Sequence, residues 1–160
     1  MTPTIDLIKA RLKYARNDLD EVLARLDQTL MDWAPSEGMR KVAGQLIEIA
    51  GSELQIISVM KYGHSISDQE VRALIGDTGD FDTLKAFIES VRRDTLAYLD
   101  SLSPEELDGE ITVPKGWHEG MGFESVPRAE IFRSIAQHEA YHTGQIVSYL
   151  WSRGDDPYKW

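Results

Sequence analysis

Hydrophobic and polar positions alternate along this chain with the three- and four-residue spacing of amphipathic helices. The first such segment begins at Thr2-Pro3, the combination of a helix cap and a proline at the first helical position. We expect this helix to end near Trp33 and to bury one apolar stripe: Ile8, Leu12, Ala15, Leu19, Val22 and Leu26.

Two further long helices follow the same spacing. The second is predicted from about Met39 to Tyr62, with polar Glu53 on its inward stripe beside Val42, Leu46, Ile49, Ile56 and Met60. The third is expected to be capped by Asp80, with an inward stripe of Leu84, Ile88, Val91, Thr95, Tyr98 and Leu102. The connection between them, residues 63–79, is expected to hold a short helix over 68–75.

The last third of the chain combines a long loop with the longest apolar helix. Ser103-Pro104-Glu105-Glu106 predicts a short helical turn, followed by a glycine-rich loop over about 108–126. Two interpretations of that loop stay open, the border of a functional site and a plain solvent loop. A fourth helix is predicted from Pro127 to Gly154, and no run has the period of a strand. Together these features predict an all-α fold, one antiparallel four-helix bundle over residues 1–160 with long connections.

Composition and charge narrow the possible functions. The balance of 42% hydrophobic and 28% charged residues in 160 is that of a globular domain, and the net charge of −10 opposes binding to nucleic acid or to anionic membranes. The chain has no cysteine, so any thiol chemistry would need a thiol from a small molecule. Because neither a signal peptide nor a membrane span is evident, we expect a cytoplasmic protein.

A polar cluster interrupts the fourth predicted helix, which is otherwise apolar on most of its circumference and is expected to be largely buried: Ile131, Phe132, Ile135, Ala136, Ala140, Ile146, Val147, Leu150 and Trp151. His138, His142 and Gln145 project from one side of it. Two imidazoles four residues apart can each place a nitrogen about 2.0–2.1 Å from one metal ion. The alternative is a pair of hydrogen-bonded histidines in a bundle core or a dimer seam.

Other metal-site patterns fit less well. His138 to His142 matches the H-E-x-x-H pattern of zinc proteases, with Glu139 as general base, but no His or Glu follows to supply the third ligand. A di-iron bundle would need a second Glu-x-x-His pair. Any third ligand should therefore come from the second helix, which offers Gln45, Glu48, Ser52 and Glu53. His64 and His118, both in connections, are expected to be surface residues.

Two segments resemble the DinB/YfiT-like superfamily of metalloenzymes. The first is His138-Glu139-Ala140-Tyr141-His142-Thr143-Gly144-Gln145-Ile146, together with the chain ending over residues 154–160. The second is Arg40-Lys41-Val42-Ala43-Gly44-Gln45-Leu46-Ile47-Glu48, which is similar to the start of that family's second helix. The number and length of the predicted helices agree with the family along nearly the whole chain.

The resemblance implies a divalent metal, nickel or zinc, held by two histidines of the last helix and one of the second. By position the pair is His138 and His142, whereas Gln45 stands at the third place and departs from the pattern. An amide oxygen is a poorer ligand than imidazole for such ions. Either Gln45 or a neighbouring glutamate completes a weaker site, or the ion has been lost. Glu48 and Gln145 are the residues next expected to contact a bound cofactor.

Two functions remain open at this point. The resemblance implies an enzyme that acts on a small-molecule substrate, of the kind that includes transferases using bacillithiol or a similar thiol cosubstrate, or a hydrolase. The alternative is a metal-free, non-catalytic bundle that binds a ligand or a partner chain. Relatives of this kind are often homodimers, and an aromatic-rich end could supply the contact area: Tyr149, Trp151, Tyr158 and Trp160.

Overall fold

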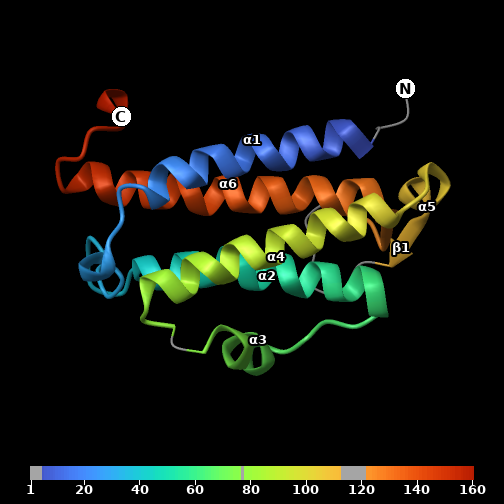
Figure 1. Cartoon of the computed structure of the whole chain (residues 1–160), viewed down its shortest axis with the longest axis horizontal. Helices are drawn as coiled ribbons and strands as arrows, with labels where there is room; N and C mark the ends of the chain where they lie inside the picture. The colour runs from blue at the N-terminus through green and yellow to red at the C-terminus, as the bar shows by residue number, and fades with distance from the viewer. Residues whose placement is uncertain (1–4, 77, 113–121) are drawn as a thin grey trace.

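The apolar stripes of the sequence become the buried faces of four long helices (Figure 1). The structure is a computed structural model and describes residues 5–76, 78–112 and 122–160. The long helices are α1 (Ile5–Leu23), α2 (Val42–Tyr62), α4 (Phe81–Ser101) and α6 (Arg128–Ser152). Two short helices, α3 (Asp68–Ile75) and α5 (Pro104–Asp108), lie in the connections, along with the 3₁₀ turns Gln28–Leu30 and Pro157–Lys159. The predicted all-α fold is confirmed.

The order of the helices in space explains the long connections. Helices α1 and α6 run in one direction, and α2 and α4 run in the opposite direction (Figure 1). Helix α1 packs mainly on α6, while α2 packs on both α4 and α6. Because α2 and α4 are parallel, the chain must return along the bundle between them, and α3 lies in that return. Helix α6 contacts both α1 and α2, so its side chains reach the centre of the bundle.

The first helix ends ten residues earlier than predicted, at Leu23 rather than near Trp33. Asp27 competes with the helix, because its side chain accepts hydrogen bonds from the backbone N–H and hydroxyl of Thr29 and caps a 3₁₀ turn. Leu26 is still buried, but in an irregular segment. That segment is joined to the start of α2 by hydrogen bonds from Val42 N–H to Trp33 C=O and from Ala43 N–H to Met31 C=O.

The loop predicted over 108–126 contains a small sheet that the sequence analysis missed. Strands β1 (Glu110–Thr112) and β2 (Ser125–Pro127) pair antiparallel, with Ile111 opposite Val126. Strands of three residues are too short to show a period of two, which explains the missed prediction. The strands close the end of the bundle where α5 packs on α6. His118 and the centre of this loop lie outside the described residues.

Helix α6 is less buried than its composition suggested. It buries a face that includes Ile131, Phe132, Ile135, Ile146 and Leu150, whereas Ala140 and Trp151 are exposed, contrary to prediction. Small and amphipathic side chains can line a solvent face at little cost, so an apolar count alone overstated burial. Tyr98 of α4 and Leu102, which follows it, were expected to face inward but are only partly buried. Leu99 is fully buried instead.

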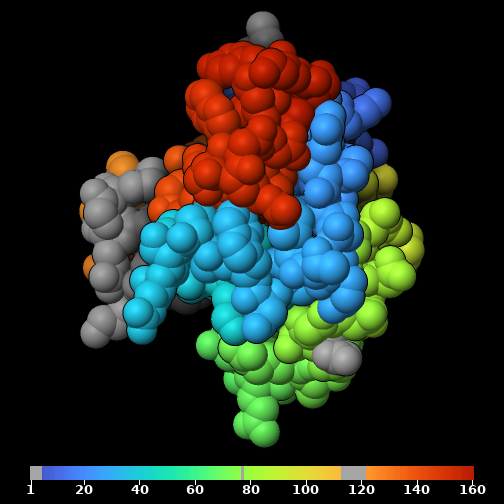
Figure 2. Space-filling view, turned by 90° about the vertical axis from the view of Figure 1, so that its left-hand side faces the viewer, coloured from blue at the N-terminus to red at the C-terminus, as the bar shows by residue number. Residues whose placement is uncertain are grey.

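The C-terminal residues fold back over the segment that follows α1 (Figure 2). The Trp160 ring packs against the Arg25 guanidinium, and its Nε1 donates a hydrogen bond to Asp155. The Trp151 and Tyr158 rings meet edge to face at the surface, with Tyr158 84% exposed. The predicted homodimer stays a prediction. Among the described helices, none is long and apolar enough to cross a membrane.

Candidate metal centre

His138 and His142 lie on successive turns of α6 and face α2. Their Nε2 atoms are 3.2 Å apart, and their rings meet at a steep angle with centroids 4.5 Å apart. His142 is buried, at 7% exposure, and His138 is half-buried. The spacing of four residues therefore does what the sequence predicted: it brings both imidazoles to one point on the inner side of the helix.

The tautomer of His142 is fixed by Gln45 of α2. Gln45 Oε1 lies 2.6 Å from His142 Nδ1, and an amide oxygen can only accept, so Nδ1 must carry the proton. The Gln45 amide nitrogen donates to the Tyr149 hydroxyl at 3.1 Å, and that hydroxyl donates to the backbone oxygen of Arg40 at 2.9 Å. This chain of hydrogen bonds holds the His142 ring in place and leaves its Nε2 lone pair directed at His138.

Glu48, one turn further along α2 from Gln45, is the third potential ligand. One ligand atom from each of Glu48, His138 and His142 lies within 4.8 Å of the others. Glu48 also forms a 2.6 Å ion pair with Arg40, both side chains being partly exposed. A carboxylate beside two imidazole nitrogens is a donor set typical of zinc and similar divalent ions.

Burial lowers the pKa of both histidines. For His138 the pKa falls mainly through desolvation and further through the neighbouring His142, while Glu48 raises it. For His142 desolvation again lowers the pKa, opposed by Glu48 and by the adjacent Gln145 side chain. The lowered pKa favours the neutral form of both rings, which a metal ion needs because its ligand nitrogen must be unprotonated.

The geometry fits a divalent ion. Two nitrogens bound at about 2.0–2.1 Å in a tetrahedral arrangement would be about 3.3 Å apart, close to the 3.2 Å separation of the two Nε2 atoms. The Oε1 atom of Gln145 is buried beside them and makes no hydrogen bond of good geometry to any described residue. A buried acceptor without a hydrogen bond of good geometry, next to two converging imidazole nitrogens, is typical of a site that takes a ligand.

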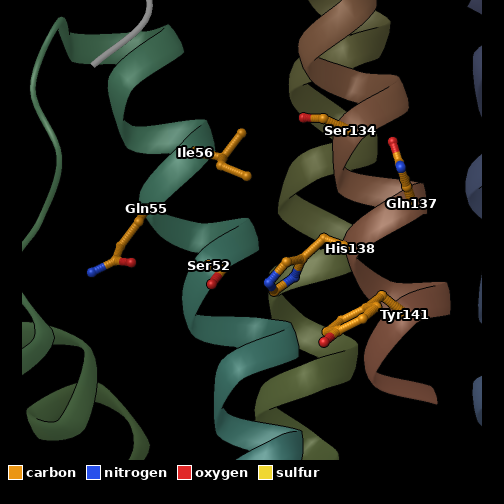
Figure 3. A pocket seen from close by; sticks show the side chains of 7 residues that line it. All are labelled: Ser52, Gln55, Ile56, Ser134, Gln137, His138 and Tyr141. Atoms are coloured by element: carbon orange, nitrogen blue, oxygen red, sulfur yellow. The ribbon is translucent and has the colours of Figure 1, made fainter. Parts of the chain in front are cut away.

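A cavity of about 420 Å³ opens directly beside His138, between α2 and α6 (Figure 3). Ser52 and Ile56 of α2 face His138 and Ser134 of α6 across it, and Tyr141 borders it one turn further along α6. The cavity would give a small molecule direct access to the histidine pair. Such a concave site next to potential metal ligands is the arrangement expected of a binding or active site.

A comparison with known protein families finds a match over most of the chain. The DinB superfamily matches residues 11–146, a span that includes most of α1, all of α2 and α4, and both histidines. The chain belongs to the DinB superfamily. No curated protein and no solved structure gives a significant match to it.

Several predicted residues of this DinB-superfamily protein are brought together, and others are not. His138, His142, Gln45, Glu48 and Gln145 form one cluster. The assignment of Gln45 as a metal ligand stays a prediction; in the structure its amide oxygen is hydrogen-bonded to His142. Ser52 borders the cavity, and His64 is exposed as predicted.

Glu53, the other candidate on α2, is engaged elsewhere. It forms a bidentate ion pair with Arg92 of α4, at 2.8 and 2.9 Å. Arg92 also donates to Glu139 at 2.6 Å, and Arg16 of α1 holds both oxygens of Glu139 at 2.9 and 3.1 Å. Each long helix thus contributes one charge to a buried quartet: Arg16, Glu53, Arg92 and Glu139. Glu139 is committed to two arginines, which agrees with setting aside its role as a protease-type base.

Sequence reasoning missed this charge quartet. Arg92 is only 6% exposed, although arginine on an amphipathic helix is usually a surface residue. A signal was present, because Glu53 lay on an apolar stripe and Glu139 lay on a helix predicted to be largely buried. Two carboxylates at inward positions require two cations from other helices.

Proposed function

We propose that this DinB-superfamily protein is a divalent-metal-dependent enzyme acting on a small molecule in the cavity beside His138. The observation that supports this best is the pair of Nε2 atoms, 3.2 Å apart on the inner side of α6. His138 and His142 would bind zinc or nickel, with the Glu48 carboxylate as third ligand. Gln45 would act through His142, by holding the proton on Nδ1 and fixing the ring.

A bound divalent ion would supply Lewis acidity and lower the pKa of a thiol or water molecule beside it. The chain's own residues provide the rest of the site. The cavity opens beside His138, so a substrate bound in it can reach the histidine pair between α2 and α6. Burial of His142 excludes water from the opposite side. Because the chain has no cysteine, a thiol transfer would use a thiol carried by a cosubstrate.

The same geometry supports one alternative, a metal-free binding protein. If His138 carried its proton on Nε2, that N–H could donate to the free Nε2 of His142 at the observed 3.2 Å. The pair would then be satisfied without an ion, and the cavity would bind a ligand without catalysis.

Native mass spectrometry of the purified protein separates these two functions. We expect one zinc or nickel ion per chain in the wild type and none in His138→Ala or His142→Ala. His64→Ala, which removes an exposed histidine from the surface, is the matched control and should retain the ion. A wild-type protein that stays metal-free after incubation with excess zinc and nickel would rule out the enzyme proposal and leave the binding protein.

A further inference from the structure

The cavity beside His138 is bordered by uncharged side chains. Apart from the histidine, its described lining consists of two serines, two glutamines, an isoleucine and a tyrosine. No lysine, arginine, aspartate or glutamate of the described residues lines it. A charged group placed there would lose water without gaining an opposite charge, whereas a neutral polar group needs only a hydrogen bond.

Several of these side chains have hydrogen-bonding capacity to spare. The Ser52 hydroxyl, the Gln137 amide and the Tyr141 hydroxyl form no hydrogen bond with any other described residue. Gln55, by contrast, points away from the cavity toward α3, where its amide nitrogen donates to Asp68 and to the backbone of Ile66 (Figure 3). Hydroxyls and amides both donate and accept, so the free groups suit a ligand that carries alcohol or amide functions.

Charge outside the cavity also disfavours an anionic ligand. The chain has a formal net charge of −10, which lowers the local concentration of anions. Arg72 of α3 borders a separate cavity of about 130 Å³, behind Ser52 and Gln55. Arg40, the arginine that acts on both histidines, is paired with Glu48. Glu48 and Asp68 share that smaller cavity, so its charges are already mixed.

We propose that the cavity beside His138 selects the uncharged body of a small organic ligand, one with amide or hydroxyl groups on an apolar frame. A carboxylate or phosphate in the same place is disfavoured. The inference rests on the proposed function only for the reactive end of the ligand, which would lie at the histidine pair. A carboxylate-bearing thiol would have to keep its carboxylates outside this cavity.

Matched probes test the selectivity on the metal-free protein. 4-Methylbenzamide and 4-methylbenzoate have nearly the same shape and differ in charge, and ¹H–¹⁵N NMR titration gives their dissociation constants. We expect the amide to bind at least about tenfold more tightly and to shift the backbone signals of Ser52 and Tyr141, because a buried unpaired carboxylate is costly. A carboxylate that binds equally well or better, or an amide that leaves those signals unmoved, would overturn the proposal.

Two variants with the same net charge separate the cavity from the charge of the whole molecule. Ser134→Lys adds a cation at the cavity wall, and Ala10→Lys adds one at an exposed position of α1. Ser134→Lys should tighten 4-methylbenzoate binding and reduce the preference for the amide at least about threefold, while Ala10→Lys should leave the ratio unchanged. An equal change in both variants would assign the preference to global charge and contradict the proposal.

Failure of this inference can be told from failure of the proposed function. The probes carry no thiol and are titrated without metal, so their ranking does not depend on zinc binding. If native mass spectrometry shows the ion but 4-methylbenzoate binds more tightly than 4-methylbenzamide, the enzyme proposal stands and the selectivity proposal is wrong. Repeating the titration in Arg72→Gln removes an anion held in the smaller cavity, and a carboxylate that still binds better than the amide in that variant shows that the selectivity proposal is wrong.

Discussion

Two polar clusters lie inside this bundle, and both depend on α6, yet they differ in how their groups are satisfied. In the charge quartet every carboxylate faces a guanidinium, and the two positive and two negative charges cancel. In the histidine cluster two ring nitrogens meet at 3.2 Å, and the buried Gln145 acceptor beside them makes no hydrogen bond of good geometry to a described residue. The first cluster is complete without a ligand. The second is satisfied fully only when something is shared between the rings.

The largest effect should come from breaking the quartet. Arg92→Met removes the arginine that pairs with both Glu53 and Glu139 and leaves two carboxylates to Arg16 alone. Removing one partner of a buried ion pair typically costs about 3–5 kcal/mol of unfolding free energy. Urea denaturation would measure the loss.

Arg133→Met is the matched control, since Arg133 pairs with Glu130 at the partly exposed surface, and its loss should cost no more than about 1 kcal/mol. Equal small losses in both variants would show that the quartet is not the buried, mutually dependent cluster described above.

The histidine cluster should respond in the opposite way, with binding affected more than folding. His142→Ala should weaken zinc affinity by more than about 100-fold, because loss of a ligand exceeds the 10- to 100-fold typical of residues that only support one. Competition with a chromogenic chelator gives the affinity. The metal-free variant should lose less unfolding free energy than Arg92→Met. Retention of wild-type zinc affinity would remove His142 from the site.

Gln45 sharpens the comparison further, because it is polar, buried and bonded to a histidine. Gln45→Leu frees the His142 ring and should reduce zinc affinity by about 10- to 100-fold. Gln55→Leu makes the same chemical change on the same helix but affects a contact with α3, so its zinc affinity should match the wild type. A loss as large as that of His142→Ala would instead support Gln45 as a direct ligand.

The smallest effect concerns pH. The pKa of each histidine is lowered in the folded protein, chiefly by burial, so below the ordinary value near 6.5 the unfolded chain binds protons that the folded one does not. In the metal-free protein the stability contributed by the neutral rings is therefore present above about pH 6.5 and declines as the pH falls through the lowered values. Urea unfolding at several pH values would show a shallower decline in His138→Ala/His142→Ala than in the wild type.

The sequence predicted the four helices and the histidine pair because both depend on spacing along one helix. It could not predict where α1 ends, since the competing hydrogen bond that Asp27 accepts from Thr29 is local and the apolar stripe continues through Leu26. It also missed Arg92 and Arg16 as interior residues. Their burial depends on charges from four helices cancelling at one point, and periodicity says nothing about contacts between helices.

The role of Gln45 could not be predicted from the sequence for the same reason. Its position in the sequence placed it near the histidines, but only the structure shows which histidine nitrogen its oxygen contacts. An oxygen facing Nδ1 supports the ring, whereas one facing the space between the Nε2 atoms would bind an ion. Glu48, kept as a secondary candidate from the sequence, is the acidic residue that lies with both rings.

The most direct test is an anomalous difference map from crystals soaked in zinc. The account predicts one peak between the Nε2 atoms of His138 and His142, about 2.0–2.1 Å from each and within ligand distance of the Glu48 carboxylate. The Gln45 amide should remain on Nδ1 of His142. A map without a peak between the two rings, or with the two rings turned apart, would contradict it.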